Sequence, residues 1–217
     1  METAFRLFKT GGVVMLPLAL LSVISLAMIL ERSLFWWRIS HRQAKLLERI
    51  LKLYRDDLKM AKVYLERNRQ LPIARIFSVA ICLKRSTPQK FELALASAIQ
   101  AEIPVLKRFN NAFSTIISVA PLLGLLGTVL GLITSMSSLR LGDLQSTQAT
   151  GVTSGIGEAL ISTATGLVIA IVTLFFASTF KGLYLRQIAA IQEYGGQLEL
   201  LHLEKYERQT ELEVRSL

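Results

Sequence analysis

Residues 109–139 read FNNAFSTIISVAPLLGLLGTVLGLITSMSSL and contain no Asp, Glu, Lys or Arg. Two further uncharged runs occur at residues 11–30 and 159–180. About 20 apolar residues are enough for a helix to cross the hydrocarbon core of a bilayer. The first run lacks a small-residue cleavage pattern, so we interpret it as a retained helix and not as a signal peptide. We therefore predict an all-α integral membrane protein with three transmembrane helices.

The distribution of basic residues predicts how these helices are oriented. Of the 25 Lys and Arg residues, 17 lie within residues 31–112 and 5 lie from Lys181 onward. The positive-inside rule places such segments in the cytoplasm, and the N-terminus and the loop between the second and third helices in the periplasm. The predicted order is a periplasmic N-terminus (1–10), transmembrane helix 1 (11–30), a basic cytoplasmic helical domain (31–112), transmembrane helix 2 (113–137), a short periplasmic loop (138–154), transmembrane helix 3 (155–180) and a cytoplasmic helical tail (181–217).

The composition argues against several other classes of protein. The chain is 52% hydrophobic and carries a net charge of +9, which we attribute to membrane topology and anionic lipid because no nucleic-acid-binding motif accompanies it. The one cysteine, Cys82, excludes an internal disulfide. The two histidines, His41 and His202, lie far apart in charged segments, and we expect both on the surface. Without a nucleophile elbow, phosphate-binding loop or zinc signature, the sequence predicts no catalytic residue, metal site or cofactor.

The segments outside the predicted membrane helices show the spacing of amphipathic helices. Apolar residues three and four positions apart predict a helix over Gln43–Arg67, and a second short helix fits residues 73–85. The tail is also helical in pattern, with Gly195 and Gly196 as a candidate point of division.

A third helix is predicted directly before the second uncharged run. Thr87 fits an N-cap and Pro88 the first helical turn. The helical pattern then continues over residues 89–108 and into the uncharged run, with a kink expected at Pro104. We therefore expect one long helix that projects out of the bilayer.

The second uncharged run carries glycines at a spacing that suits helix packing. Gly127 and Gly131 are four residues apart and share a face, and Gly124 lies one turn before Thr128. Small residues at this spacing allow helices to approach closely in lipid, so packing explains Gly124, Gly127 and Gly131. A threonine hydroxyl can bond to its own helix backbone, so Thr128 by itself indicates no function.

The third uncharged run is preceded by an acidic residue that begins a polar stripe. Glu158, Ser162 and Thr165 lie at i, i+4 and i+7, whereas Thr163 points elsewhere. An ionised carboxylate inside a membrane is costly, which favours a functional residue that faces a cavity or a partner. Alternatively, Glu158 lies in the first helical turn near the outer surface, where the helix dipole stabilises it without any function. The spacing leaves both interpretations open.

Two motifs resemble those of the MotA/TolQ/ExbB proton-channel family. They are APLLGLLGTVLG at residues 120–131 and GEALISTATGL at residues 157–167. Topology and length are similar over nearly the whole chain, and ExbB and TolQ are the most similar branches. By matching position, the resemblance implies that Thr128 and Thr163 line a pore and that Glu158 is its intramembrane acid. We place Ser162 and Thr165 on the same polar wall.

The resemblance also implies an assembly in a bacterial inner membrane. A ring of copies, expected to be pentameric, would enclose the membrane helices of a dimeric, single-span ExbD- or TolR-like partner. Protons would be the coupling ion, and they would pass as a carboxylate on the partner helix is alternately protonated and released. The resulting movement would act on a TonB- or TolA-like protein, and no covalent reaction would be catalysed.

Several functions therefore compete. An ExbB-like role in uptake across an outer membrane is the leading hypothesis, and a TolQ-like role in envelope integrity is the close alternative. A motility stator ranks third, because such proteins usually carry a larger cytoplasmic domain. A passive membrane scaffold that conducts nothing represents a different class.

The chain departs from the family pattern at one point in the third uncharged run. Where the family often has a proline after an Ala-Ile step, this chain has Val172 and Thr173.

Overall fold

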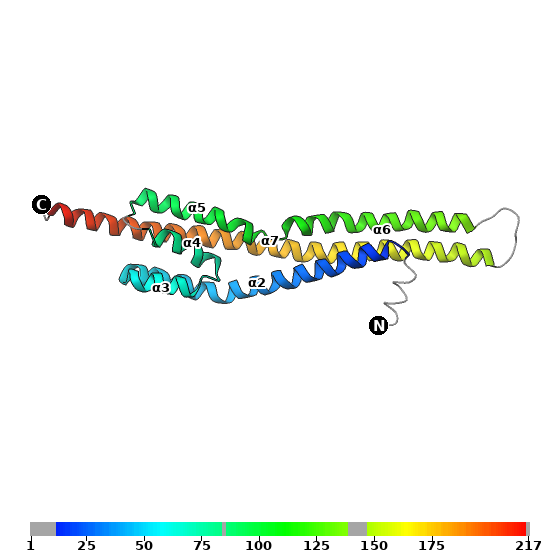
Figure 1. Cartoon of the computed structure of the whole chain (residues 1–217), viewed down its shortest axis with the longest axis horizontal. Coiled ribbons are helices and arrows are strands. Elements are labelled where there is room, and N and C mark those ends of the chain that lie inside the picture. The colour runs from blue at the N-terminus through cyan, green and yellow to red at the C-terminus, as the bar shows by residue number, and fades with distance from the viewer. Residues whose placement is uncertain (1–11, 84–85, 139–146, 216–217) are drawn as a thin grey trace. The chain divides into compact units, whose positions relative to one another are not determined.

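The computed structural model describes residues 12–83, 86–138 and 147–215, which are almost entirely helical and include no strand (Figure 1). The helices are α2 (Met15–Asp56), α3 (Leu58–Arg67), α4 (Pro72–Ile81), α5 (Pro88–Leu106), α6 (Asn110–Ser138) and α7 (Thr147–Arg215). Three helical stretches are long and apolar enough to cross a membrane, namely Met15–Gln43, Pro88–Ser137 and Thr153–Leu212. The predicted all-α class with three helices of this kind is confirmed.

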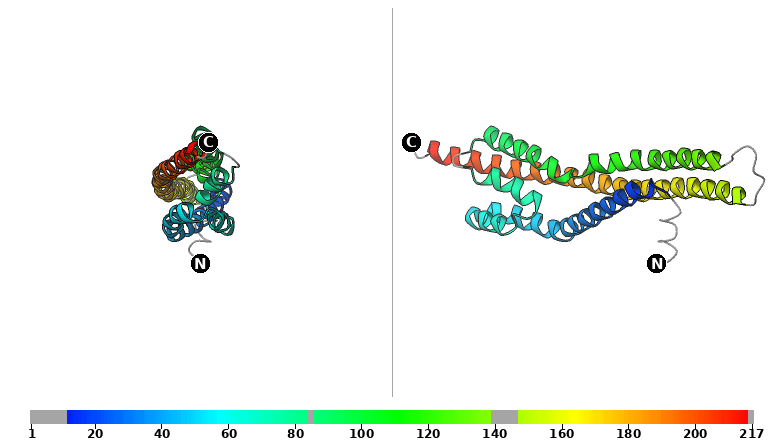
Figure 2. Two further views of the ribbon diagram at one scale, coloured as in Figure 1. Left: turned by 90° about the vertical axis from the view of Figure 1, so that its left-hand side faces the viewer. Right: turned by 45° about the vertical axis from the view of Figure 1, so that its right-hand side comes forward.

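The chain forms two compact units, and α2 and α7 contribute residues to both. The first unit comprises the chain up to Arg32 together with Phe109–Phe180. Within it, α6 and the neighbouring part of α7 lie side by side in Figure 1 and in the right-hand view of Figure 2. Large apolar side chains such as Leu125, Leu160 and Ile171 stay exposed on these helices. Exposed apolar surface of this kind is what a helix in contact with lipid or with another membrane helix requires.

The second unit comprises Ser33–Arg108 and Lys181–Leu217. Its centre is α4, which packs against α3 and α5. The side chains of Ile73, Ile76 and Phe77 in this short apolar helix are fully buried. The guanidinium of Arg75 binds both carboxylate oxygens of Glu102 at 2.6 Å and so connects α4 to α5. The exposed thiol of Cys82 lies at the C-terminal cap of α4.

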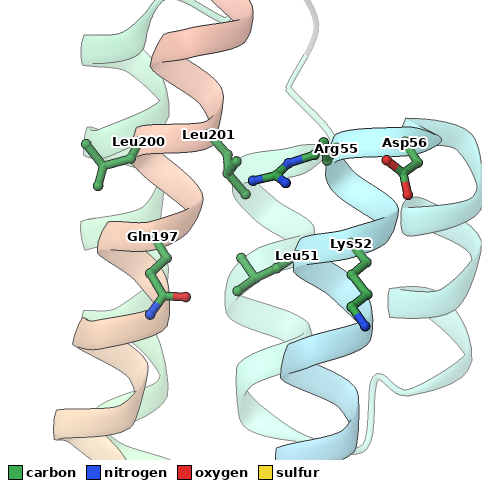
Figure 3. Close-up of a pocket in the computed structure, with 7 residues that line it drawn as sticks. All are labelled: Leu51, Lys52, Arg55, Asp56, Gln197, Leu200 and Leu201. Carbon is green, nitrogen blue, oxygen red and sulfur yellow. The ribbon is translucent and has the colours of Figure 1, made fainter.

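A groove of about 390 Å³ separates parts of α2 and α7 within the second unit (Figure 3). Leu51 and Arg55 point from α2 toward α7, and Leu201 points from α7 toward α2, whereas Leu200 points away. The two helices therefore pack loosely here and leave a space with a basic edge.

The predicted helix over Gln43–Arg67 is interrupted at Asp57, so this prediction is wrong at one residue. Asp57 has extended backbone angles (φ −147°, ψ 98°). Its carboxylate accepts hydrogen bonds from the backbone N–H groups of Lys59 (2.9 Å) and Met60 (3.1 Å). This is an N-cap, which separates α3 from α2. A one-residue break leaves the apolar spacing nearly intact, so the spacing could not reveal it.

The predicted continuous helix through Pro104 is also interrupted, but at Phe109. The helix α5 passes Pro104, and α6 starts afresh after a short turn. Phe109 has φ 68°, a left-handed conformation that is uncommon for a bulky residue and cannot continue a helix. The guanidinium of Arg32 lies 5.6 Å from the centre of the Phe109 ring. An attractive cation–π contact therefore accompanies the unusual backbone.

In the C-terminal tail a break was predicted at Gly195 and Gly196, but α7 continues through both residues without interruption. A Cβ atom on Gly195 would lie 3.2 Å from Cδ2 of Leu95. Gly195 therefore allows close approach between α7 and α5 and is no helix terminator. The helix predicted over residues 73–85 ends at α4's last residue, and residues 84 and 85 lie outside the described part.

The expectation that both histidines lie on the surface is wrong for His202. His41 is exposed. The half-buried His202 ring stacks on Phe91, with 4.2 Å between ring centres, and hydrogen-bonds to the Tyr54 hydroxyl at 2.7 Å. Sequence spacing could not predict this, because the partners of His202 come from distant parts of the chain.

Candidate functional site

The glycines of α6 face α7 at close range. A Cβ on Gly124 would lie 3.0 Å from the Cα of Thr163, and one on Gly131 would lie 2.6 Å from the carbonyl oxygen of Gly155. A Cβ on Gly127 would collide with the hydroxyl of Ser162. Side chains at these positions would force the helices apart, so the glycines set the distance between α6 and α7.

Hydroxyl groups of α7 lie directly in this contact. The Thr163 hydroxyl donates to the carbonyl oxygen of Gly124 at 3.0 Å, across the two helices. Ser162 is fully buried, and its hydroxyl donates to the Ala159 carbonyl at 2.9 Å. Two of the predicted site residues, Ser162 and Thr163, thus meet the glycines of α6. Within one chain they serve the helix contact.

The hydroxyls of Thr128 and Thr165 bond within their own helices. Thr128 donates to the Leu125 carbonyl at 2.6 Å, and Thr165 donates to the Ile161 carbonyl at 2.8 Å. Each hydroxyl oxygen keeps capacity to accept a hydrogen bond from water or from another side chain. Polar groups of this type can therefore stay in an apolar helix at low cost and still interact with water.

Glu158 lies well inside α7, because this helix begins at Thr147. The interpretation that places Glu158 in the first helical turn is therefore wrong. Its half-buried carboxylate lies against Gly12, where any Cβ would collide with it. Gly12 has φ +70°, which glycine adopts readily, and it lies three residues before the first residue of α2. The positive end of the α2 dipole is therefore close to an acid carried by another helix.

A buried hydroxyl pair that the sequence analysis missed connects α2 to α7. Ser25 and Thr173 are both buried, and their side-chain oxygens are 2.7 Å apart. The Thr173 hydroxyl donates to the Ile169 carbonyl at 2.7 Å, so Ser25 is the donor between the two helices. The sequence shows more than one hydroxyl residue in each of the two uncharged runs, and nothing in it reveals that these two meet.

Arg32 and Glu31, which directly follow the first uncharged run, form a second polar arrangement. The Arg32 side chain is 2% exposed, and its Nε lies 2.8 Å from a carboxylate oxygen of Glu31. A cation so deeply buried needs such partners, because removing an unpaired charge from water is costly. Arg32 also contacts the Phe109 ring, so it connects the two segments of the first unit at the residues where each meets the second unit in sequence.

Known proteins are similar in sequence to most of this chain. The sequence pattern of the MotA/TolQ/ExbB proton channel family matches residues 68–193. A Synechocystis protein described as biopolymer transport protein ExbB-like 3 is 53% identical over 94% of this chain and 97% of its own length. The Synechocystis ExbB-like 1 protein is 38% identical over 91% of this chain and 78% of its own length. An ExbB homologue of Methanothermobacter thermautotrophicus is 26% identical over 83% of this chain and 63% of its own length.

Proposed function

Because the chain belongs to the MotA/TolQ/ExbB proton channel family, we propose that it is an ExbB-like proton-channel subunit. With an ExbD-like single-span partner it would use the proton-motive force to energise a TonB-like protein for uptake across an outer membrane. The observation that carries the proposal is the pairing of the uncharged helix α6 with the apolar part of α7, which together hold Glu158 and several hydroxyl groups in otherwise apolar surroundings.

The chemistry of these side chains suits proton movement. Hydroxyls such as those of Thr128 and Thr163 accept and donate hydrogen bonds without carrying a permanent charge, so they can order a chain of water molecules. Glu158 adds a group that can bind and release a proton. In the proposed assembly these residues line a wet path beside the partner helix, and a carboxylate of that helix carries the proton onward.

The exposed apolar faces of α6 and α7 support an assembly of several copies. Side chains such as Leu122 (63% exposed) and Phe175 (67% exposed) need cover from lipid or from protein. We propose a homo-oligomeric ring, pentameric by resemblance, in a bacterial inner membrane with the N-terminus in the periplasm and the C-terminus in the cytoplasm. The excess of Lys and Arg within residues 31–112 and from Lys181 onward supports this orientation.

Purification of the native complex in mild detergent, followed by mass spectrometry and reconstitution into liposomes, tests the proposal. We expect a small single-span protein with an intramembrane Asp to co-purify, and we expect the vesicles to take up protons under an imposed gradient. A TolA-like third component would instead select the TolQ-like role. A homo-oligomer alone, recovered from several detergents and without proton flux, would favour a passive scaffold.

Three variants locate the path within the same proton-flux assay. Glu158→Gln and Thr163→Val should reduce proton flux toward that of protein-free vesicles while the complex stays assembled. Thr179→Val is the matched control, because Thr179 is an exposed threonine of α7 whose hydroxyl donates to its own helix, at Phe175, at 2.9 Å. Equal flux in all three variants, or loss of assembly without a selective loss of flux, would contradict the proposal.

A further inference from the structure

The second unit contains a polar cluster, centred on His202, that the proposed proton path does not use. The His202 ring stacks nearly parallel on Phe91 of α5, with an interplanar angle of 13°. Its Nδ1 lies 2.7 Å from the hydroxyl of Tyr54 in α2. Its Nε2 lies 3.1 Å from the carbonyl oxygen of Ser86, just before α5. One imidazole on α7 thus joins three segments that are distant in sequence.

The partners of the two ring nitrogens define the protonation state that this geometry favours. A carbonyl oxygen only accepts, so the contact with the Ser86 carbonyl requires a hydrogen on Nε2, and the Ser86 hydroxyl oxygen, 3.2 Å from Nε2, can accept from the same hydrogen. In the neutral imidazole Nδ1 then accepts, and the Tyr54 hydroxyl is its donor. A second ring proton would occupy Nδ1 and oppose the hydroxyl hydrogen of Tyr54. Protonation therefore breaks this hydrogen bond unless the Tyr54 hydroxyl turns away.

The surroundings of His202 also disfavour a positive charge. Burial lowers the pKa of His202 most, the nearby Lys205 ammonium lowers it further, and the Ser86 carbonyl partly opposes both. Lys205 is itself fixed by a 2.8 Å hydrogen bond to the Tyr54 backbone carbonyl. Burial also raises the pKa of Tyr54 to about 12, so this residue stays neutral and supplies no compensating negative charge.

Acidic side chains on the neighbouring elements do not compensate His202 either. The helix α5 presents the uncharged Phe91 to the imidazole. On α7, burial raises the pKa of Glu199 most, and the negative charge of Glu92 raises it further. The helix α4 contributes only the apolar Ala80 and Ile81 to the adjoining cavity. Among the described residues, Lys205 is the charged group that shifts the pKa of His202, and the titratable side chains of Tyr54, Lys205 and Tyr206 border the same cavity as the imidazole.

A cavity of about 650 Å³ lies beside the cluster and is bordered by His202, Tyr54 and Phe91. Polar groups of Ser86, Gln209 and Thr210 also line it. Water can therefore reach the edge of the imidazole, and the ring can exchange protons with the surrounding solution. Burial is sufficient to disfavour the charged form, but the site is open enough to titrate.

We propose that His202 is a pH-sensitive switch, which holds α2, the start of α5 and α7 together when neutral and loosens them when protonated. The folded unit favours the neutral form, so its stability is complete above the ordinary histidine pKa of 6.5 and falls as the pH drops below that value. The proposal concerns the second unit alone and does not require proton conduction by the first. In a proton-channel subunit, the switch would respond to acidification on the side where protons arrive.

Hydrogen exchange of the full chain in detergent, followed by mass spectrometry between about pH 7.5 and about pH 5.5, tests this switch across the histidine range. In the wild type, exchange protection of the backbone around Phe91 and Tyr54, corrected for intrinsic rates, should fall with pH. Over this range the fall can reach about tenfold, because the lower pH lies one pH unit below the ordinary histidine pKa of 6.5. In His202→Gln, whose amide is neutral throughout, protection should not change with pH. His41→Gln is the matched control, because His41 is the other histidine of the chain and is exposed.

A wild type without this pH dependence, or a His202→Gln variant that retains it, would overturn the proposal. Loss of the dependence in His41→Gln would do the same. If His202→Gln fails to fold, NMR titration of ¹³C-labelled histidine in the wild type and in Tyr54→Phe gives the answer. The Tyr54 hydroxyl stabilises neutral His202, so Tyr54→Phe should raise the pKa of His202 relative to the wild type. An unchanged or lowered pKa would contradict the role assigned to this hydrogen bond.

Discussion

At the scale of single residues, the approach of α6 to α7 depends on which glycines have neighbours. Gly131 has almost no free space, since an added Cβ would lie 3.0 Å from the Cβ of Ala159 and closer still to a backbone oxygen. Gly157 of α7 has no neighbouring heavy atom within 4 Å of such a Cβ. The same substitution should therefore have opposite effects at the two positions.

We predict that Gly131→Ala destabilises the protein by about 1–3 kcal/mol, which is typical of an overpacked contact. Gly157→Ala should leave stability unchanged or raise it by up to about 1 kcal/mol, because alanine favours helix more than glycine does. Thermal unfolding of both variants in one detergent measures the difference. Equal melting temperatures would show that the glycine contact does not determine the distance between the helices.

The sequence predicted the contacts of some of these residues and not of others, and the difference has a physical reason. Residues on one helix face follow from a spacing of three and four, so Gly127 and Gly131 could be assigned to a packing surface in advance. The Ser25–Thr173 hydrogen bond joins two helices, and its prediction requires their relative register, which no spacing within one helix contains. The roles of Thr128, Glu158 and Thr163 in proton movement stay predictions.

At the scale of helices, the division between α2 and α3 depends on one capping residue. The Asp57 carboxylate binds two backbone N–H groups of α3 that would otherwise lack helical partners. Asp56 is the last residue of α2, where a negative charge opposes the helix dipole. The two adjacent aspartates thus have opposite local effects.

We predict that Asp57→Ala lowers stability by about 1 kcal/mol, the usual cost of losing an N-cap. Asp56→Ala should have no effect or a slightly stabilising one. Chemical unfolding of both variants measures the stabilities, and hydrogen exchange at Lys59 and Met60 locates the change. If Asp56→Ala proved as costly as Asp57→Ala, the loss would reflect removal of charge and not of the cap.

Helices were easier to predict than the breaks between them. Apolar periodicity identifies α2, α3, α5 and α7 because each must bury one face or cross lipid. The breaks at Asp57 and Phe109 depend on the backbone angles of single residues and leave that periodicity intact. Gly195 is the converse case: glycine often ends a helix, but here it lies inside α7 and allows α7 to approach α5 closely.

At the scale of the whole molecule, the charge distribution and the family together predict an assembly and an orientation that a single chain does not display. The number of transmembrane-length helices follows from composition and is confirmed. The ring, the partner and the orientation depend on surfaces that meet other molecules, such as the exposed Leu160 and Ile171. One chain presents these surfaces without their partners, so they stay proposals.

Cys82 is the single cysteine of the sequence and is exposed, so chemical labelling of its thiol can report the membrane topology of the native protein. A maleimide that cannot cross membranes should label Cys82 in inverted inner-membrane vesicles and should not label it in intact spheroplasts, because this residue lies in the segment assigned to the cytoplasm. The reverse pattern would invert the proposed orientation. Each copy carries one such thiol, so a fluorophore attached there would also count the copies in a purified complex by its bleaching steps, without any engineered site.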